Sequence, residues 1–168
     1  MQAINDTSYL LDHVSAALHR QSDQVLQERL GIGMSQYKIL TMLQWRPGAT
    51  QRDLADYLGQ TEASISRQIK LLQQKGLLAS HVDPAERRRH LAALTSKGVK
   101  LTLAAHEVIA EYHAPMLAKL NPREQEQLQA MLTTLHEYTC APGRRMACDR
   151  PLDIETVYDN QQQRLKEG

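Results

Sequence analysis

The stretch "TQRDLADYLGQTEASISRQIKLLQQKG" at residues 50–76 decides the fold, because it encodes two short helices joined by a turn. The first helix is predicted to begin at Thr50, whose hydroxyl can cap a free amide at the helix start. Asp53, three residues later, favours the positive end of the helix dipole. Leucine and alanine side chains then recur at helical spacing until Gly59 ends the helix.

A second helix is predicted to begin at Thr61 and to stop at Gly76. Ile65, Ile69 and Leu72 recur at steps of four and three, so they are expected on one buried face. Two helices of this length, joined by only a few residues, have the spacing of a helix-turn-helix.

A β-hairpin is predicted directly after these helices. The apolar-rich segments "LLASHV" (77–82) and "RHLAAL" (89–94) are separated by an Asp-Pro turn at residues 83 and 84. Three consecutive arginines, at positions 87 to 89, lie between the turn and the second segment. A helix-turn-helix followed at once by a basic hairpin is typical of a winged helix.

Longer helices are predicted on both sides of this unit. Apolar residues recur at steps of three and four over residues 5–29, and a short apolar helix follows up to "RPG" at 46–48. Thr95 or Ser96 can begin a long helix over residues 97–119, and Asn121, as a cap followed by proline, begins another that ends near residue 138. Beyond it the sequence indicates a linker, and residues 152–167 could form a short polar helix.

The charge is unevenly distributed along a chain whose formal net charge is only +1. Residues 46–100 contain ten Lys or Arg against five acids, whereas the rest of the chain has ten Lys or Arg against fourteen acids. A basic middle between acidic arms suits a DNA-binding unit whose flanking segments have another role.

Composition excludes several classes of protein. The 168 residues are 42 % hydrophobic, and no apolar run reaches the roughly 20 residues that a membrane span needs. Since the first residues also lack a signal-peptide pattern, a cytoplasmic protein is expected. Cys140 and Cys148 are too few for a disulfide scaffold, and the seven histidines show no i, i+4 pair, so we expect no metal site and no cofactor. No phosphate loop, nucleophile elbow or metal-binding helix motif is present, so an enzyme is not expected.

The predicted second helix of the helix-turn-helix fits the major groove of DNA, and the hairpin can reach the adjacent minor groove, whose negative potential attracts arginine. Short polar side chains at the helix start would allow a close approach to base edges. The rival interpretation is a winged helix used only for protein contact. The predicted DNA-binding residues are Thr61, Glu62, Ser64, Ser66, Arg67 and Lys70 in the helix, and Arg87, Arg88 and Arg89 in the hairpin.

These features together resemble the MarR family of transcriptional regulators. The motifs "MSQYKIL", "PGATQRDLADYL", "SISRQIKLLQQKGLL", "DPAERRRHLAALTSKGVKL" and "LNPREQEQLQAML" have the family's order and spacing over roughly residues 8–138. The resemblance implies an α+β, mostly α, fold: a winged helix-turn-helix with long N- and C-terminal dimerisation helices. It implies a homodimer, with residues 1–33 and 97–138 as the dimerisation region, 34–96 as the winged-helix DNA-binding domain and 139–168 as a C-terminal linker with a possible short helix.

The resemblance also assigns roles in the wing. Asp83 and one arginine would brace its turn, and another arginine would enter the minor groove; we expect Arg87 in the groove and Arg88 in bracing or phosphate contact. The expected function is that of a transcriptional regulator, a repressor, which binds a pseudo-palindromic operator as a homodimer.

Members of the family commonly respond to small aromatic or anionic ligands. The candidates for such a site are His13, Tyr37, Trp45 and Arg46, because an arginine and a tyrosine could hold a carboxylate and a phenol-like ring. The alternative is a redox or metal sensor on the same scaffold, which would use Cys140 and Cys148 or the histidines. The first predicted helix has no cysteine, whereas the redox-sensing branch of the family carries a reactive one there.

Overall fold

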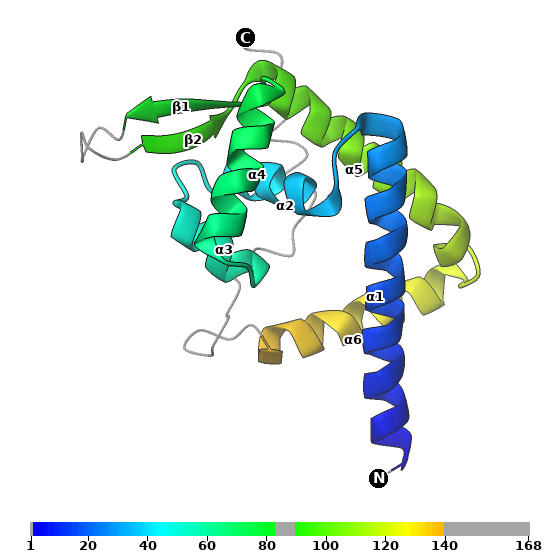
Figure 1. Cartoon of the computed structure of the whole chain (residues 1–168). Helices are drawn as coiled ribbons and strands as arrows, with labels where there is room; N and C mark the ends of the chain where they lie inside the picture. Colours follow the sequence, from blue (N-terminus) through cyan, green and yellow to red (C-terminus); the bar gives the residue numbers. More distant parts are fainter. Residues whose placement is uncertain (1, 83–89, 140–168) are drawn as a thin grey trace. The chain divides into compact units, whose positions relative to one another are not determined.

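The computed structural model describes residues 2–82 and 90–139, without the side chains of residues 2–5, 82 and 90. These residues form a mostly helical fold with one two-stranded antiparallel sheet, as the sequence predicts (Figure 1). The chain divides into two compact units, Met1–Leu117 and Ala118–Gly168. In chain order the elements are α1 (Gln2–Leu30), α2 (Met34–Trp45), α3 (Gln51–Leu58), α4 (Glu62–Gln74), β1 (Leu78–Val82), β2 (His90–Leu94), α5 (Ser96–Leu117) and α6 (Pro122–Thr139).

The starts of α3 and α4 follow the predicted caps. The Thr50 side chain accepts from the Asp53 backbone N–H at 3.0 Å, and the Asp53 carboxylate accepts from the Thr50 N–H at 2.7 Å, which is a complete capping box. In α4 the Thr61 hydroxyl accepts from the Ser64 N–H at 3.2 Å. Both threonines predicted to begin helices therefore do so through their side chains.

Helix α2 has a different kind of start. Its N-cap is Gly33, which has no side chain to accept a bond, and the Asp23 carboxylate of α1 accepts from the Met34 N–H at 2.6 Å instead. A Cβ at residue 33 would lie 3.0 Å from that carboxylate oxygen, so the glycine leaves room for this bond. The acid that stabilises the start of α2 thus comes from the preceding helix.

The hydrophobic core of the first unit joins the helix-turn-helix to the neighbouring elements. The inward faces predicted for α2, α3 and α4 are confirmed, and each fully buried aliphatic side chain there contributes about 1.5–3 kcal/mol to folding. The side chains with at most 5 % exposure include Leu26 of α1, Ile39, Leu40 and Leu43 of α2, Leu54 of α3, Ile65, Ile69 and Leu72 of α4, Leu78 of β1 and Ala105 of α5.

Helix α1 buries only part of its apolar stripe. Val25 and Leu26, near its end, are buried, but Tyr9, Leu10 and Val14 are 65, 57 and 46 % exposed.

Within the described residues, no helix combines the length and the apolar character needed to cross a membrane.

The hairpin pairs β1 with β2 in a register that runs from Leu78 opposite Leu94 to Val82 opposite His90. Leu91 is buried and Leu94 packs against the core, so β2 is anchored by its apolar residues. Figure 1 shows the two strands extending from the same end of the unit at which α4 ends and α5 begins.

The junction between β2 and α5 depends on Thr95 and Gly98. The Thr95 hydroxyl donates to the Gly76 carbonyl at 2.8 Å and accepts from the Gly98 N–H at 3.0 Å, so Thr95 caps α5. Gly98 is buried against the backbone of Leu77, and a Cβ at this position would lie 2.1 Å from the Leu77 carbonyl oxygen. Only glycine allows the start of α5 to approach the backbone of Leu77, between α4 and β1, this closely.

Gly98→Ala is therefore expected to destabilise the protein by about 2 kcal/mol, although alanine in a helix interior normally stabilises by about 1 kcal/mol. The overlap with the Leu77 carbonyl must be relieved by moving backbone, which costs more than the gain in helix propensity. Urea unfolding measures the change, and Ser96→Ala, at an exposed position of the same turn, is the control with a change below about 0.5 kcal/mol. An unchanged or higher stability of the Gly98 variant would contradict this packing.

Candidate nucleic-acid interface

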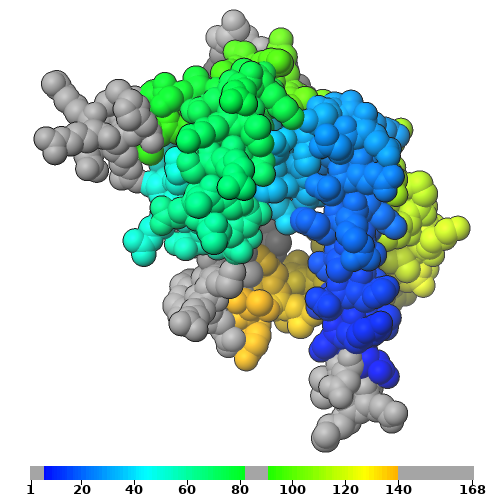
Figure 2. Space-filling view, viewed as in Figure 1, coloured from blue at the N-terminus to red at the C-terminus, as the bar shows by residue number. Residues whose placement is uncertain are grey.

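Helix α4 has one buried face and one face open to solvent. Ile65, Ile69 and Leu72 fix its inner side in the core, while Glu62, Ala63, Arg67, Lys70 and Gln74 are exposed on the outer side. The space-filling view shows α4 at the surface next to α3 (Figure 2). A helix that is held in the core by its apolar face and exposes its polar face can enter the major groove of DNA while its packing in the protein stays intact.

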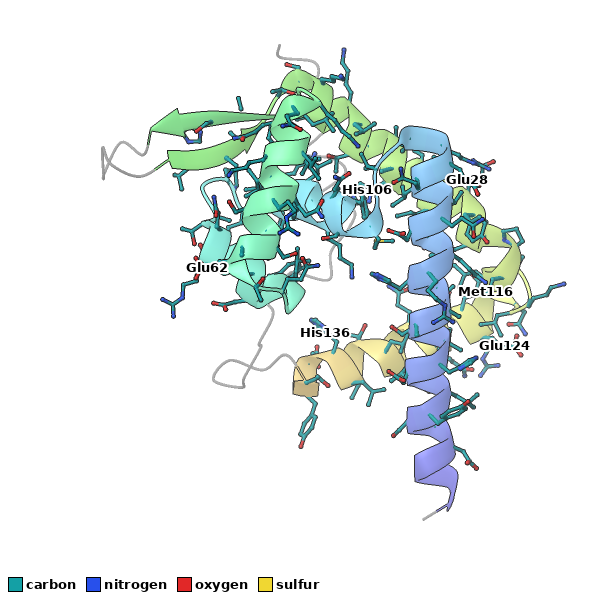
Figure 3. The ribbon with its side chains drawn as sticks, viewed as in Figure 1. Glu28, Glu62, His106, Met116, Glu124 and His136 are labelled. Carbon is teal, nitrogen blue, oxygen red and sulfur yellow. The ribbon has the colours of Figure 1, made fainter. Side chains whose placement is uncertain are left out.

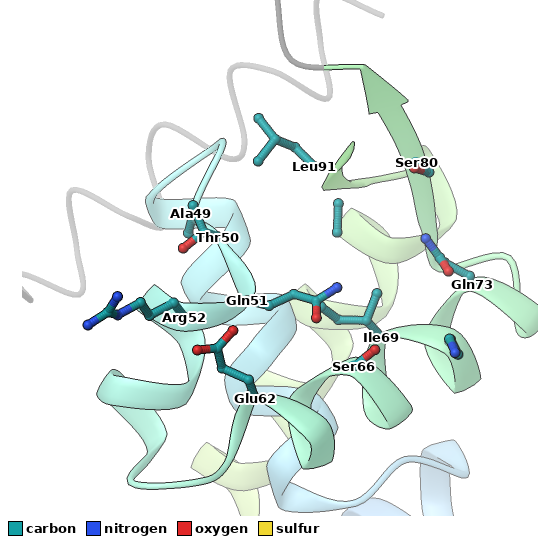
Figure 4. A pocket seen from close by; sticks show the side chains of 12 residues that line it. Ala49, Thr50, Gln51, Arg52, Glu62, Ser66, Ile69, Gln73, Ser80 and Leu91 are labelled. Atoms are coloured by element: carbon teal, nitrogen blue, oxygen red, sulfur yellow. The ribbon is translucent and has the colours of Figure 1, made fainter. Parts of the chain in front are cut away.

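An open groove of about 520 Å³ runs along one side of this helix. It is lined by Thr50, Gln51 and Arg52 at the start of α3, by Glu62, Ser66 and Lys70 of α4, and by Ser80 and Leu91 of the hairpin, among others (Figure 4). The groove therefore brings three of the residues predicted to bind DNA together with the start of α3. Arg67 lies outside this lining, on the outer face of α4.

Gln51 and Arg52 were not among the predicted site residues. They directly follow the Thr50 cap, so they lie on the first turn of α3, and both are exposed. Their position directly after a helix cap could have predicted them. The first turn of a helix offers free N–H groups to a phosphate, and a nearby cation strengthens that attraction.

Two of the predicted hydroxyl groups make hydrogen bonds within the protein. Thr61 accepts from the Ser64 N–H, and the Ser64 hydroxyl donates to the Gln60 side-chain oxygen at 3.2 Å. The Gln60 amide in turn donates to the Ser35 hydroxyl of α2 at 3.1 Å. These groups thereby hold the turn of the helix-turn-helix against α2.

A second polar link joins α2 to the middle of α4. The side-chain amide of Gln36, which is buried, donates to the side-chain oxygen of Gln68 at 3.1 Å. The next residue, Tyr37, is half-buried, and its hydroxyl lies 2.7 Å from Nδ1 of His106 on α5, with the two rings edge to face. Figure 3 marks His106 beside α2. Sequence reasoning did not pair His106 with Tyr37, because 69 residues separate them.

The four candidate ligand residues do not form one cluster around Tyr37. Trp45 ends α2 eight residues after Tyr37, so their Cα atoms are about 12 Å apart along the helix. Arg46 is exposed, and its backbone N–H caps α2 by donating to the Met42 carbonyl at 2.7 Å. His13 is exposed on α1 and stacks on Tyr9, with ring centroids 5.7 Å apart.

Several predicted residues lie outside the described part of the chain. These are Asp83, Arg87, Arg88 and Arg89 of the wing, and Cys140, Cys148 and the remaining tail up to residue 168. Among the described residues, no group of three or more His, Cys, Asp or Glu side chains is placed to hold a metal ion.

Comparison with known proteins assigns the family. A family model described as "MarR family" matches residues 30–89, which contain α2, α3, α4 and β1. The crystal structure of MepR, a transcription regulator of the Staphylococcus aureus multidrug efflux pump MepA, is 30 % identical, covers 78 % of this chain and 96 % of MepR, and superposes with a TM-score of 0.64. The chain belongs to the MarR family. It is a transcriptional regulator of that family.

Two further relatives extend this comparison. The HTH-type transcriptional repressor Rv2887 of Mycobacterium tuberculosis is 28 % identical over 76 % of this MarR-family chain and 91 % of its own length. A structure of Rv2887 in complex with p-aminosalicylic acid has a TM-score of 0.66 and covers 76 % of this chain and 96 % of that one. A MepR–DNA complex, at 30 % identity, covers 79 % of this chain and 96 % of that one, with a TM-score of 0.63.

The link between α2 and α4 can be measured in this MarR-family regulator with a double-mutant cycle. Gln36→Ala and Gln68→Ala are expected to show a coupling energy of about 1 kcal/mol in urea unfolding, because each substitution alone removes the partner of the other amide. The exposed pair Gln24 and Glu28 on α1, joined at 2.8 Å, is the matched control, with a coupling of about 0.3 kcal/mol. Equal couplings in the two cycles would show that Gln36 and Gln68 do not fix α4.

Proposed function

We propose that this MarR-family regulator is a cytoplasmic repressor, which binds a pseudo-palindromic operator in double-stranded DNA as a homodimer and responds to a small aromatic or anionic ligand. The observation that carries the proposal is the two-sided character of α4: its apolar side is fixed in the core, and its polar and cationic side is open. The repressor name of Rv2887 and the DNA complex of MepR support this assignment.

The chemistry of the interface divides between affinity and sequence discrimination. Arg67 and Lys70 on the outer side of α4, together with Arg52 on α3, would neutralise phosphates, which gives affinity that falls steeply with salt. The side chains at the start of α4 would contact base edges in the major groove. The wing residue Arg87 would enter the minor groove, Asp83 would brace the turn, and Arg88 would brace it or contact a phosphate; Arg89 is proposed as a DNA-binding residue without a more specific role.

Exposed apolar side chains support the homodimer. Large apolar residues lie at the surface of the first half of α1, the end of α5 and much of α6, although such side chains normally avoid water. Each one that a partner subunit covers would contribute about 1.5–3 kcal/mol to association. They are Tyr9, Leu10, Leu11 and Val14 on α1, Tyr112, Met116 and Leu117 on α5, and Leu128, Met131, Leu132, Leu135 and Tyr138 on α6.

Selection of bound duplexes from random DNA tests the repressor proposal. The wild-type protein is expected to recover an inverted repeat whose half-site centres lie about 10 base pairs apart, since two α4 helices related by a two-fold axis must enter successive turns of the major groove. Val14→Asp is expected to lower the fraction of dimer and to weaken binding to the recovered duplex at least about tenfold, because it places a charge in the proposed dimer surface.

The control for this variant is Ser15→Asp, which adds the same charge at a neighbouring exposed polar position of α1. Molar mass from light scattering gives the oligomeric state. Failure of the wild-type protein to enrich any sequence would contradict the proposed operator, and a wild-type monomer would contradict the dimer.

The proposed ligand response is supported by the position of Tyr37. Its hydroxyl contacts His106 of α5, while the two preceding residues, Ser35 and Gln36, are hydrogen-bonded to Gln60 and to Gln68 of α4. A ligand whose acidic or phenolic group replaced the contact between Tyr37 and His106 would shift α2, and α4 would follow. His13, Trp45 and Arg46 do not cluster around Tyr37 within one subunit, so we propose them as ligand contacts only where the homodimer brings them to the ligand. The Rv2887 complex shows that a relative of this chain binds an aromatic acid.

The same aromatic acid can serve as the probe. p-Aminosalicylate is expected to change the affinity of the wild-type protein for its selected duplex at least threefold. Tyr37→Phe is expected to raise the p-aminosalicylate concentration that gives half of this effect by about tenfold, which corresponds to the loss of one hydrogen bond of about 1.4 kcal/mol. Ser96→Ala, which removes a hydroxyl at an exposed position at the start of α5, is the control and should leave this concentration unchanged. No effect of the probe on wild-type binding would contradict the assignment to aromatic acids.

A further inference from the structure

Glu62 is an acid in a surface proposed to bind a polyanion. It is the first residue of α4 and the sole acidic residue of that helix, and its side chain is exposed. It lines the groove that also contains Arg52 and Lys70, and Figure 4 shows its carboxylate at the start of α4 on the side of Gln51 and Arg52. A carboxylate about 4 Å from a phosphate is repelled even in water, so Glu62 does not contribute to phosphate affinity.

Packing and capping do not account for this side chain either. Thr61 already satisfies the Ser64 N–H, and α4 has no reciprocal bond of the kind that Asp53 makes in α3. Glu62 makes no hydrogen bond or ion pair with any other residue that the structure describes. Its favourable interaction with the helix dipole would be available to an acid on any side of the first turn. The helix dipole therefore does not explain why Glu62 lies on the side of α4 that faces the groove.

A carboxylate in the major groove can only accept hydrogen bonds. The amino groups of cytosine and adenine are donors there, whereas guanine offers O6 and N7 and thymine offers O4, all of which are acceptors that a carboxylate repels. We infer that Glu62 determines specificity at one position of each half-site by accepting a hydrogen bond from the exocyclic amino group of a base. The expected base is cytosine, and adenine is the other base that offers such a group. This inference rests on the proposed DNA binding through α4.

The neighbours of Glu62 on the same side of α4 agree with this role. Ser66 follows one turn later and Lys70 two turns later, and both line the same groove. Lys70 can hold a phosphate or a guanine, and Ser66 is small and neutral, so the helix presents an acid, a neutral group and a cation in succession. An acid at its start also lowers affinity for DNA in general, so that a matching amino group is required to offset the repulsion.

The test compares the wild-type protein with Glu62→Gln, both as the full chain. Random-duplex selection with each protein identifies the base pair whose preference differs, and affinities are then measured for all four base pairs at that position. We expect the wild-type protein to favour the base pair that places cytosine at the contacted position over the pair that places thymine there by about tenfold, and the variant to lose most of this preference while binding unrelated DNA more tightly. Preference for cytosine or for adenine at this position distinguishes the two amino groups.

Two matched variants separate base contact from other effects of charge. Asp56→Asn removes one negative charge from an exposed position of α3 and should leave the selected sequence unchanged. Lys70→Ala should weaken binding to all four duplexes alike and reduce the slope of log affinity against log salt by about 1. Thermal unfolding of the Glu62 variant shows whether it remains folded at the temperature of the binding measurements.

The outcomes decide between the inference and the function on which it rests. Selection of the same sequence, with the same discrimination, by wild-type protein and Glu62→Gln would overturn the role of Glu62 and leave DNA binding intact. An equal change of sequence with Asp56→Asn would also overturn it, because total charge would then be the cause. If the wild-type protein selected no sequence at all, the proposed operator binding and the role of Glu62 would both be wrong.

Discussion

The first turn of α2 holds the rest of the first unit together, because four consecutive residues each bond to a different partner outside that turn. Two of these partners lie on the long helices α1 and α5, and two lie at or in α4 and hold it from its start and from its middle. The pairs are Met34 with Asp23, Ser35 with Gln60, Gln36 with Gln68, and Tyr37 with His106. One turn of helix therefore links α4 to both α1 and α5 through polar contacts.

Most of these links are neutral. Amide and hydroxyl pairs contribute about 1 kcal/mol each, far less than the apolar anchors Ile65, Ile69 and Leu72 that hold α4 to the core. The apolar contacts thus keep α4 folded, and the polar links set its orientation. A ligand needs a differential binding energy of only 1–3 kcal/mol to shift such an orientation, which is the usual range of coupling between sites.

The outer side of α4 separates two requirements of DNA recognition. In the proposed complex with DNA, Arg67 and Lys70 would attract phosphates independently of sequence, whereas Glu62 would oppose this attraction. Affinity from cations alone would hold the protein on any DNA, so we propose that the acid at the start of the helix improves discrimination at the expense of total affinity. Both effects depend on the fixed inner face, since an α4 that moved freely could not keep these side chains in register with base pairs.

The sequence by itself determined the elements, their order and the family resemblance. Caps such as Thr50 and Thr61, the helical spacing of apolar residues and the turn of the hairpin are local signals that act within a few residues, and the structure confirms the elements they predict. Only the tertiary structure decided that Asp23 caps α2, that Tyr37 meets His106, and that Gly98 must lack a side chain beside Leu77. These contacts join residues far apart in the chain, and no local pattern encodes which distant partner a buried polar group or a glycine will meet.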